Sequence, residues 1–67
     1  MEIDDIRGLT DDELDTELND SHREMMNLRF RESTMQLVNV QEIKKIRRRI
    51  ARINTVMRER EMAKAAR

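Results

Sequence analysis

The sequence predicts an all-α fold: an antiparallel, coiled-coil-like two-helix hairpin preceded by a short N-terminal helical turn. The 67 residues include one glycine and no proline, which disfavours a turn-rich β fold. Two helix-capping patterns divide the chain, and the segment after the second one carries isoleucines at alternating spacings of three and four residues. Because a chain of this length holds one small core, we expect a single domain over residues 1–67.

The first nine residues carry an apolar side chain at every third position, at Ile3, Ile6 and Leu9. This spacing places the three side chains on one side of a helix. We therefore expect one short helical turn here, and we expect Gly8 to bend the chain ahead of the first long helix.

The first long helix is predicted over about residues 10–35. Thr10 can accept a hydrogen bond from the Glu13 amide while the Glu13 carboxylate reaches back to the Thr10 amide, which is a capping box. Ser21 and Glu32 interrupt the apolar stripe that follows. The stripe consists of Leu14, Leu18, Met25, Leu28 and Met35.

Met26 and Phe30 lie beside this stripe rather than within it. They either complete the packing between the helices or form an apolar edge for a protein or RNA partner. Both alternatives are open from the sequence.

The second long helix is predicted over about residues 41–62. Asn39 can cap its first turn, and Glu42 can reciprocate. Because the connection between the helices has only about five residues, the helices must be antiparallel neighbours. Residues 63–67 have no partner face and are expected to fray. The apolar seam consists of Ile43, Ile46, Ile50, Ile53 and Met57.

Charge is divided unevenly along the chain, although lysines and arginines together equal the acidic residues at 14 each. Residues 1–24 hold ten acidic residues and two arginines, whereas residues 25–67 hold twelve basic and four acidic residues. Such asymmetry indicates either that the basic half meets a polyanion or that the two halves attract each other.

The side of the second helix opposite its seam is basic. At 100° per residue, Lys44, Arg48 and Arg52 lie there one above another, beside the small residues Ala51 and Thr55. A face of this kind binds a phosphate backbone through charge and does not read base sequence. The alternative is an ordinary solvated helix exterior. Two further arginines, Arg47 and Arg58, flank one edge of the seam.

The composition argues against several other functions. Without cysteine, and with His22 as its one histidine, the chain offers no disulfide scaffold and no multi-histidine metal site. We expect no bound metal or cofactor, and the acids near the first cap are explained by the helix dipole. The apolar runs are shorter than the roughly 18 residues of a membrane span, and the acidic N-terminus does not resemble a signal peptide. No set of nucleophile, base and orienting residue indicates an enzyme.

Three segments of the chain resemble one family. Residues 9–14 match a Leu-Ser-x-Glu-Glu-Leu start conservatively, residues 27–30 read Asn-Leu-Arg-Phe, and the run from Arg47 to Arg60 matches a basic pattern with Met57 in a leucine position. These segments resemble the ribosomal protein L twenty-nine family of the large subunit (universal ribosomal protein twenty-nine, bacterial type), and the similarity covers about residues 6–60.

This resemblance implies a helical protein of the cytoplasmic ribosome that contacts large-subunit ribosomal RNA near the exit of the nascent-chain tunnel. It also implies ribosomal protein L twenty-three as a neighbour, in a region where targeting factors and chaperones dock. Together with Lys44 on the basic face, the resemblance gives the RNA-facing positions expected in this sequence. They are Asn27, Arg29, Phe30, Lys44, Arg47, Arg48, Arg52, Thr55 and Arg58.

The connection between the helices departs from the family pattern. Met35 stands where the family has a glycine, and Val40 stands where it has a proline. We therefore expect a more helical loop here. The first 24 residues are also more acidic than is usual for the family.

Two binding functions compete with a structural ribosomal role. A helical adaptor without nucleic acid would pair its seam and its Met26–Phe30 edge with a second copy, and its melting would then depend on concentration. A DNA-binding zipper is disfavoured, because its basic region precedes its seam on one continuous helix, whereas here the charges interleave with the seam.

Overall fold

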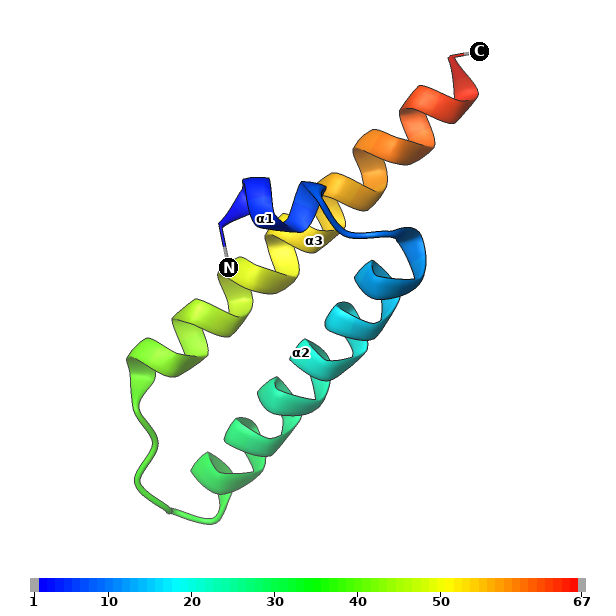
Figure 1. Cartoon of the computed structure of the whole chain (residues 1–67). Helices are drawn as coiled ribbons and strands as arrows, with labels where there is room; N and C mark the ends of the chain where they lie inside the picture. The colour runs from blue at the N-terminus through cyan, green and yellow to red at the C-terminus, as the bar shows by residue number, and fades with distance from the viewer. Residues whose placement is uncertain (1, 67) are drawn as a thin grey trace.

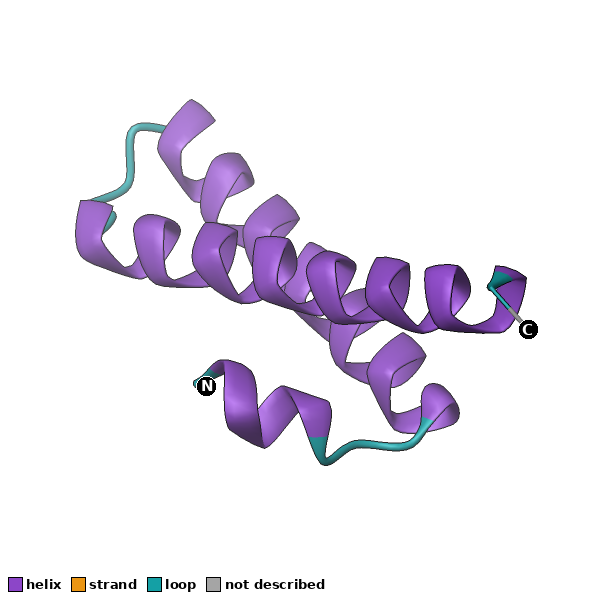
Figure 2. Cartoon of the chain, turned by 90° about the horizontal axis from the view of Figure 1, so that it is seen from above, coloured by secondary structure: helices purple, strands orange, loops and turns teal. Residues whose placement is uncertain are grey.

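In the computed structural model, which describes residues 2–66, the chain folds into three helices. They are α1 (Ile3–Arg7), α2 (Asp11–Ser33) and α3 (Val40–Ala65), and the described residues contain no strand. The long helices α2 and α3 form an antiparallel hairpin, and α1 packs on α3 (Figure 1). Seen from above, α2 and α3 cross obliquely (Figure 2). The molecule is a rod of 50 × 17 × 16 Å, and the prediction of an all-α hairpin is confirmed.

Helix α1 closes one end of the hairpin. Ile6 is fully buried and forms one core cluster with Leu14 of α2 and with Ile53 and Val56 of α3. Gly8 follows α1 with φ −80° and ψ −6°, which is ordinary right-handed backbone. The chain turns here as expected, but a residue with a side chain can adopt the same conformation.

Helix α2 begins with the capping box predicted from the sequence. The Thr10 hydroxyl accepts from the Glu13 backbone N–H at 3.2 Å, and the Glu13 carboxylate accepts from the Thr10 backbone N–H at 3.0 Å. Two donors at the exposed helix start are thereby satisfied. The helix itself starts at Asp11, one residue later than predicted, and ends at Ser33, two residues earlier than predicted.

The expectation of a more helical loop is wrong, because α2 ends in a left-handed turn. Met35 has φ 61°, the conformation that usually requires glycine. Its N–H donates to the Glu32 carbonyl at 3.1 Å, and the Gln36 N–H donates to the Arg31 carbonyl at 2.9 Å. This pair of bonds is a Schellman motif, which satisfies carbonyls that the helix end would otherwise leave free. Met35 is therefore 96% exposed and is not part of the apolar stripe.

Helix α3 is longer at both ends than predicted. Asn39 caps it, since the Asn39 side chain accepts from the Gln41 N–H at 2.9 Å, but the Glu42 side chain does not reciprocate. At the other end the helix continues to Ala65, three residues past its predicted end and into the segment that we expected to fray; Arg67 lies outside the described residues. Alanines favour this extension, and Lys64 lies 3.8 Å from the Asp11 carboxylate.

The core consists of two clusters along the hairpin. The first is the cluster around Ile6 at the α1 end, and the second joins Met25 and Leu28 of α2 to Ile46 of α3. Ser21 is fully buried between the long helices. The predicted seam is correct in direction, but Ile43, Ile50 and Met57 are half-buried.

Val56 was not predicted as a core residue because it lies to one side of the seam. It is only 2% exposed, since α1 packs against that side of α3. The sequence predicted the short N-terminal helix but not the side of α3 on which it packs.

Candidate nucleic-acid interface

The outer face of α3 presents basic side chains that the fold does not use. Lys44, Arg47, Arg48 and Arg58 are all exposed, and none forms an ion pair with another of residues 2–66. Because burying Ile46 and Ile53 fixes the rotation of α3, Lys44 and Arg48 must point away from the core.

Two other predicted residues of α3 differ from this group. The Thr55 hydroxyl, although exposed, donates to the Ala51 carbonyl at 2.9 Å, so its proton is used within the helix. Arg52 is half-buried, whereas we expected it to be as exposed as Arg48. The structure therefore keeps Arg52 closer to the fold than its neighbours one turn away.

The arginines on the other side of α3 bind within the chain. The Arg60 guanidinium donates to the Asp11 carboxylate at 2.7 Å and to the carbonyls of Leu9 and Arg7 at 2.6 and 3.1 Å. It thereby ties the segment between α1 and α2 to α3. The hydrogen bond from Arg60 holds the pKa of Asp11 below its ordinary value, with help from the positive charge of Lys64.

Two more ion pairs lie along the same side of the hairpin. Arg49 is 3.4 Å from the Glu24 carboxylate, and Arg7 is 3.1 Å from that of Glu59. The charge asymmetry was interpreted either as attraction between the two halves of the chain or as a basic surface for a polyanion. Each interpretation applies to a different side of α3. One side attracts acids of the same chain, and the other leaves its cations available to a partner.

The predicted residues of α2 do not form one patch with those of α3. Asn27 and Arg29 are two positions apart, which places them about 200° apart around the helix. Phe30 is 64% exposed and Met26 is 71% exposed, so neither packs in the core. The nine predicted residues therefore spread around the rod rather than converging on one pocket.

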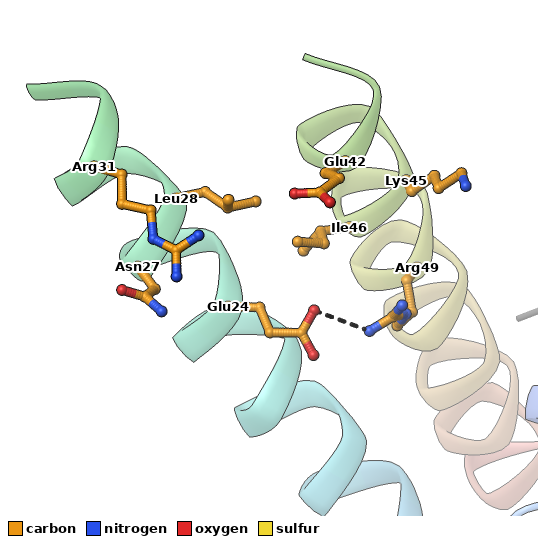
Figure 3. A pocket seen from close by; sticks show the side chains of 8 residues that line it. All are labelled: Glu24, Asn27, Leu28, Arg31, Glu42, Lys45, Ile46 and Arg49. Carbon is orange, nitrogen blue, oxygen red and sulfur yellow. Dashed lines mark hydrogen bonds and ion pairs between the residues drawn. The ribbon is translucent and has the colours of Figure 1, made fainter. Parts of the chain in front are cut away.

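A groove between α2 and α3 was not predicted from the sequence. It has a volume of about 400 Å³ and lies near the connecting loop (Figure 3). Only Asn27 among its lining residues was a predicted site residue. The polar residues of the groove form two runs in the sequence, one on each long helix, with spacings of three and four residues within each run. The sequence alone does not show that the two runs face each other, because this depends on the register of the hairpin. The lining residues are Glu24, Asn27, Leu28, Arg31, Glu42, Lys45, Ile46 and Arg49.

The chemistry of these surfaces is that of charge and hydrogen bonding. Residues 2–66 contain no group of three or more histidines, cysteines or acids placed to hold a metal ion. Across the same residues, no helix combines the length and apolar character needed to cross a membrane. Fold and surface together define a class: a small helical hairpin with an exposed cationic helix face, suited to a polyanion.

Comparison with known proteins identifies the family of the chain. The family model described as Ribosomal L29 protein matches residues 4–60, and the chain belongs to this family. It is 55% identical over 62 residues to the large ribosomal subunit protein uL29 of Dehalococcoides mccartyi, covering 92% of this chain and 95% of the relative.

More distant relatives carry the same name. The uL29 protein of Pelotomaculum thermopropionicum is 47% identical over 62 residues, covering 92% of each chain. That of Mycobacterium avium is 48% identical over 61 residues, covering 91% of this chain and 79% of the relative. The resemblance seen in the sequence is thereby confirmed.

Proposed function

We propose that this chain is a structural constituent of the large ribosomal subunit and binds large-subunit ribosomal RNA near the exit of the nascent-chain tunnel. The family membership supports the ribosomal assignment, since the relatives are named as large-subunit proteins. The single observation that carries RNA binding is a set of exposed cations without an ion pair among residues 2–66: Lys44, Arg47, Arg48 and Arg58.

These cations suit a phosphate backbone. Three of the four are arginines, whose planar guanidinium can hold two phosphate oxygens at once. Ala51 lies among them and presents little bulk, so the backbone can approach α3 closely. Contacts of this kind position the protein on folded RNA without reading its sequence.

The proposed role is structural rather than catalytic, and it places the protein on cytoplasmic ribosomes. Ribosomal protein L twenty-three is the proposed protein neighbour, and targeting factors or chaperones at the tunnel exit are further proposed partners. The exposed side chains of Met26 and Phe30 would suit a contact at that place, because apolar side chains exposed on a helix gain free energy when a partner covers them.

The same two side chains favour a second candidate function, a self-associating adaptor. In that case Met26 and Phe30 would pack against a second copy, and the melting temperature would rise with protein concentration.

Co-sedimentation with large ribosomal subunits in high salt tests the proposed function. We expect the wild-type chain to stay with the subunit and the double variant Arg48→Glu/Arg58→Glu to be released. Asp12→Asn/Asp15→Asn is the control, because it also changes two exposed charges but away from the proposed RNA face. Release of the wild type, together with concentration-dependent melting, would favour the adaptor instead.

A further inference from the structure

The groove between α2 and α3 has an apolar floor and a polar wall. Leu28 and Ile46 face each other across it and are 7% and 5% exposed, so they form a nearly closed base (Figure 3). Its volume of about 400 Å³ lies within the range of pockets that hold small organic groups, roughly 300–1,000 Å³.

The wall holds hydrogen-bonding groups that the fold leaves unused. The side chains of Asn27, Arg31 and Glu42 have no hydrogen bond or ion pair with any of residues 2–66. The Nε atom of Arg49 is buried and has no hydrogen-bond partner there. Its guanidinium reaches the Glu24 carboxylate only at 3.4 Å, which is long for a charged pair. Apart from the Glu24–Arg49 pair, the donors and acceptors around the apolar floor have no partner among residues 2–66, and those of Asn27, Arg31 and Glu42 are open to solvent.

This combination selects among possible occupants. A free phosphate would be attracted by Arg31, Lys45 and Arg49, but it would not use the apolar floor of Leu28 and Ile46. An apolar side chain would cover the floor but would displace water from Asn27 and Glu42 without replacing its hydrogen bonds, which costs free energy. A nucleobase has an apolar face and a polar edge, and so it matches both parts of the groove.

We propose that the groove receives one unpaired nucleobase of the bound RNA. The base lies against Leu28 and Ile46, and its exocyclic amino group donates to Glu42 while the Asn27 amide bonds its edge. Arg31, at the rim, holds the phosphate of the same nucleotide. This inference rests on the proposed function and adds base recognition to a protein whose α3 face contacts only backbone.

Chemical footprinting of large-subunit ribosomal RNA bound to the full chain tests this proposal. Reagents that modify the Watson–Crick edges of unpaired A, C and G report on the inserted base, and hydroxyl-radical cleavage reports separately on the backbone. The test variants are Asn27→Ala and Arg31→Gln. Their matched controls are Asn19→Ala and Arg23→Gln, which change the same residue types at exposed positions of α2 outside the groove.

We expect the wild type and both controls to protect one unpaired base. Asn27→Ala and Arg31→Gln should restore the reactivity of that base at saturating protein and weaken affinity about tenfold each, while the backbone footprint remains. Both test positions are exposed, and alanine is a better helix former than asparagine, so the helix should be retained.

A backbone footprint without any protected unpaired base would overturn the groove proposal and leave the proposed function intact. The groove proposal would also be overturned if the test variants protected the base as well as the controls do. Absence of any footprint from the wild-type chain would instead contradict RNA binding itself, and the groove proposal with it.

Discussion

Ser21 and Met35 occupy positions that disfavour their own side chains. Ser21 is fully buried in the helix interface, and its hydroxyl has no hydrogen-bond partner among the described residues. Met35 has left-handed backbone, and its apolar side chain is exposed to solvent. Both residues therefore reduce the stability of the hairpin, and each can be tested by one substitution.

Replacing Ser21 with alanine should stabilise the protein. The substitution removes a buried polar group without a partner, which is worth about 1 kcal/mol in the free energy of unfolding, and it favours the helix slightly. Urea denaturation measures the change. Ser33→Ala is the control, because the Ser33 hydroxyl is exposed and donates to the Phe30 carbonyl. An unchanged or lower stability in Ser21→Ala would indicate that the buried hydroxyl is satisfied in solution.

Replacing Met35 with glycine should also stabilise the protein. Relief of the left-handed conformation gains about 1–2 kcal/mol, and the greater freedom of glycine in the unfolded chain removes part of this, leaving a net gain of about 0.5–1 kcal/mol. Leu37→Gly is the matched control: Leu37 is equally exposed but lacks positive φ, so it should lose stability. Equal losses in both variants would contradict the left-handed turn.

The carboxylates at the start of α2 make stability depend on pH. The pKa of Asp11 is lowered by Arg60, and the pKa of Glu13 is lowered by the backbone and hydroxyl of Thr10. A lowered pKa in the folded state means that the stabilisation is present above the unfolded pKa and is lost as pH falls through the folded pKa. Stability should therefore decline below about pH 4.5.

Thermal melts of Asp11→Asn, Arg60→Gln and the double variant from pH 2 to 7 test the Asp11 part of this decline. Each single variant should reduce the slope on the acid side, Asp11→Asn more than Arg60→Gln because Lys64 still lowers the pKa of Asp11 when Arg60 is replaced. The double variant should reduce the slope no further than Asp11→Asn alone. Additive effects would show that Asp11 and Arg60 act separately.

At the scale of the elements, the sequence predicted what depends on local pattern. The Thr10 capping box, the short helix around Ile6 and the direction of the α3 seam all follow from spacings within one segment. The burial of Val56 and the groove could not be predicted in this way. Both depend on the register with which separate helices meet.

The turn at Met35 shows a different limit of sequence reasoning. The residue type argued for helix, yet the short connection forces the chain to reverse, and the two Schellman hydrogen bonds offset the cost of left-handed backbone. Of the candidate site, the exposed face of Lys44 and Arg48 followed from the helix period, whereas the internal pairing of Arg60 and the partial burial of Arg52 required the fold.

Truncation of the α3 seam should reflect the burial of each side chain rather than its place in the periodic pattern. Ile53→Ala should lower the free energy of unfolding by about 3 kcal/mol, because Ile53 is fully buried between α1 and α2. Ile50→Ala should lower it by about 1–2 kcal/mol, since Ile50 is only half-buried. Arg48→Ala should have little effect on stability. Urea melts rank the three variants, and equal losses from Ile50 and Ile53 would contradict the packing of α1.

At the scale of the whole molecule, the rod has two sides with different uses. Arg49, Arg60 and Lys64 of α3 bind acids from the N-terminal half and hold the helices together. On the outer face, Lys44, Arg47, Arg48 and Arg58 have no such role within the described residues. The net charge of zero therefore conceals a cationic surface. Because Arg49, Arg60 and Lys64 already pair with N-terminal acids, the cations of the outer face are not needed to neutralise those acids.

The salt dependence of RNA binding tests this account most directly. If each of the four outer cations of α3 neutralises one phosphate of a large-subunit ribosomal RNA fragment, log affinity should fall with log salt at a slope of roughly −2.8 to −3.6. Arg48→Glu/Arg58→Glu should flatten the slope, while Asp12→Asn/Asp15→Asn should leave it unchanged. A wild-type slope near zero, or a slope that the arginine substitutions leave unchanged, would contradict phosphate binding by the outer face of α3.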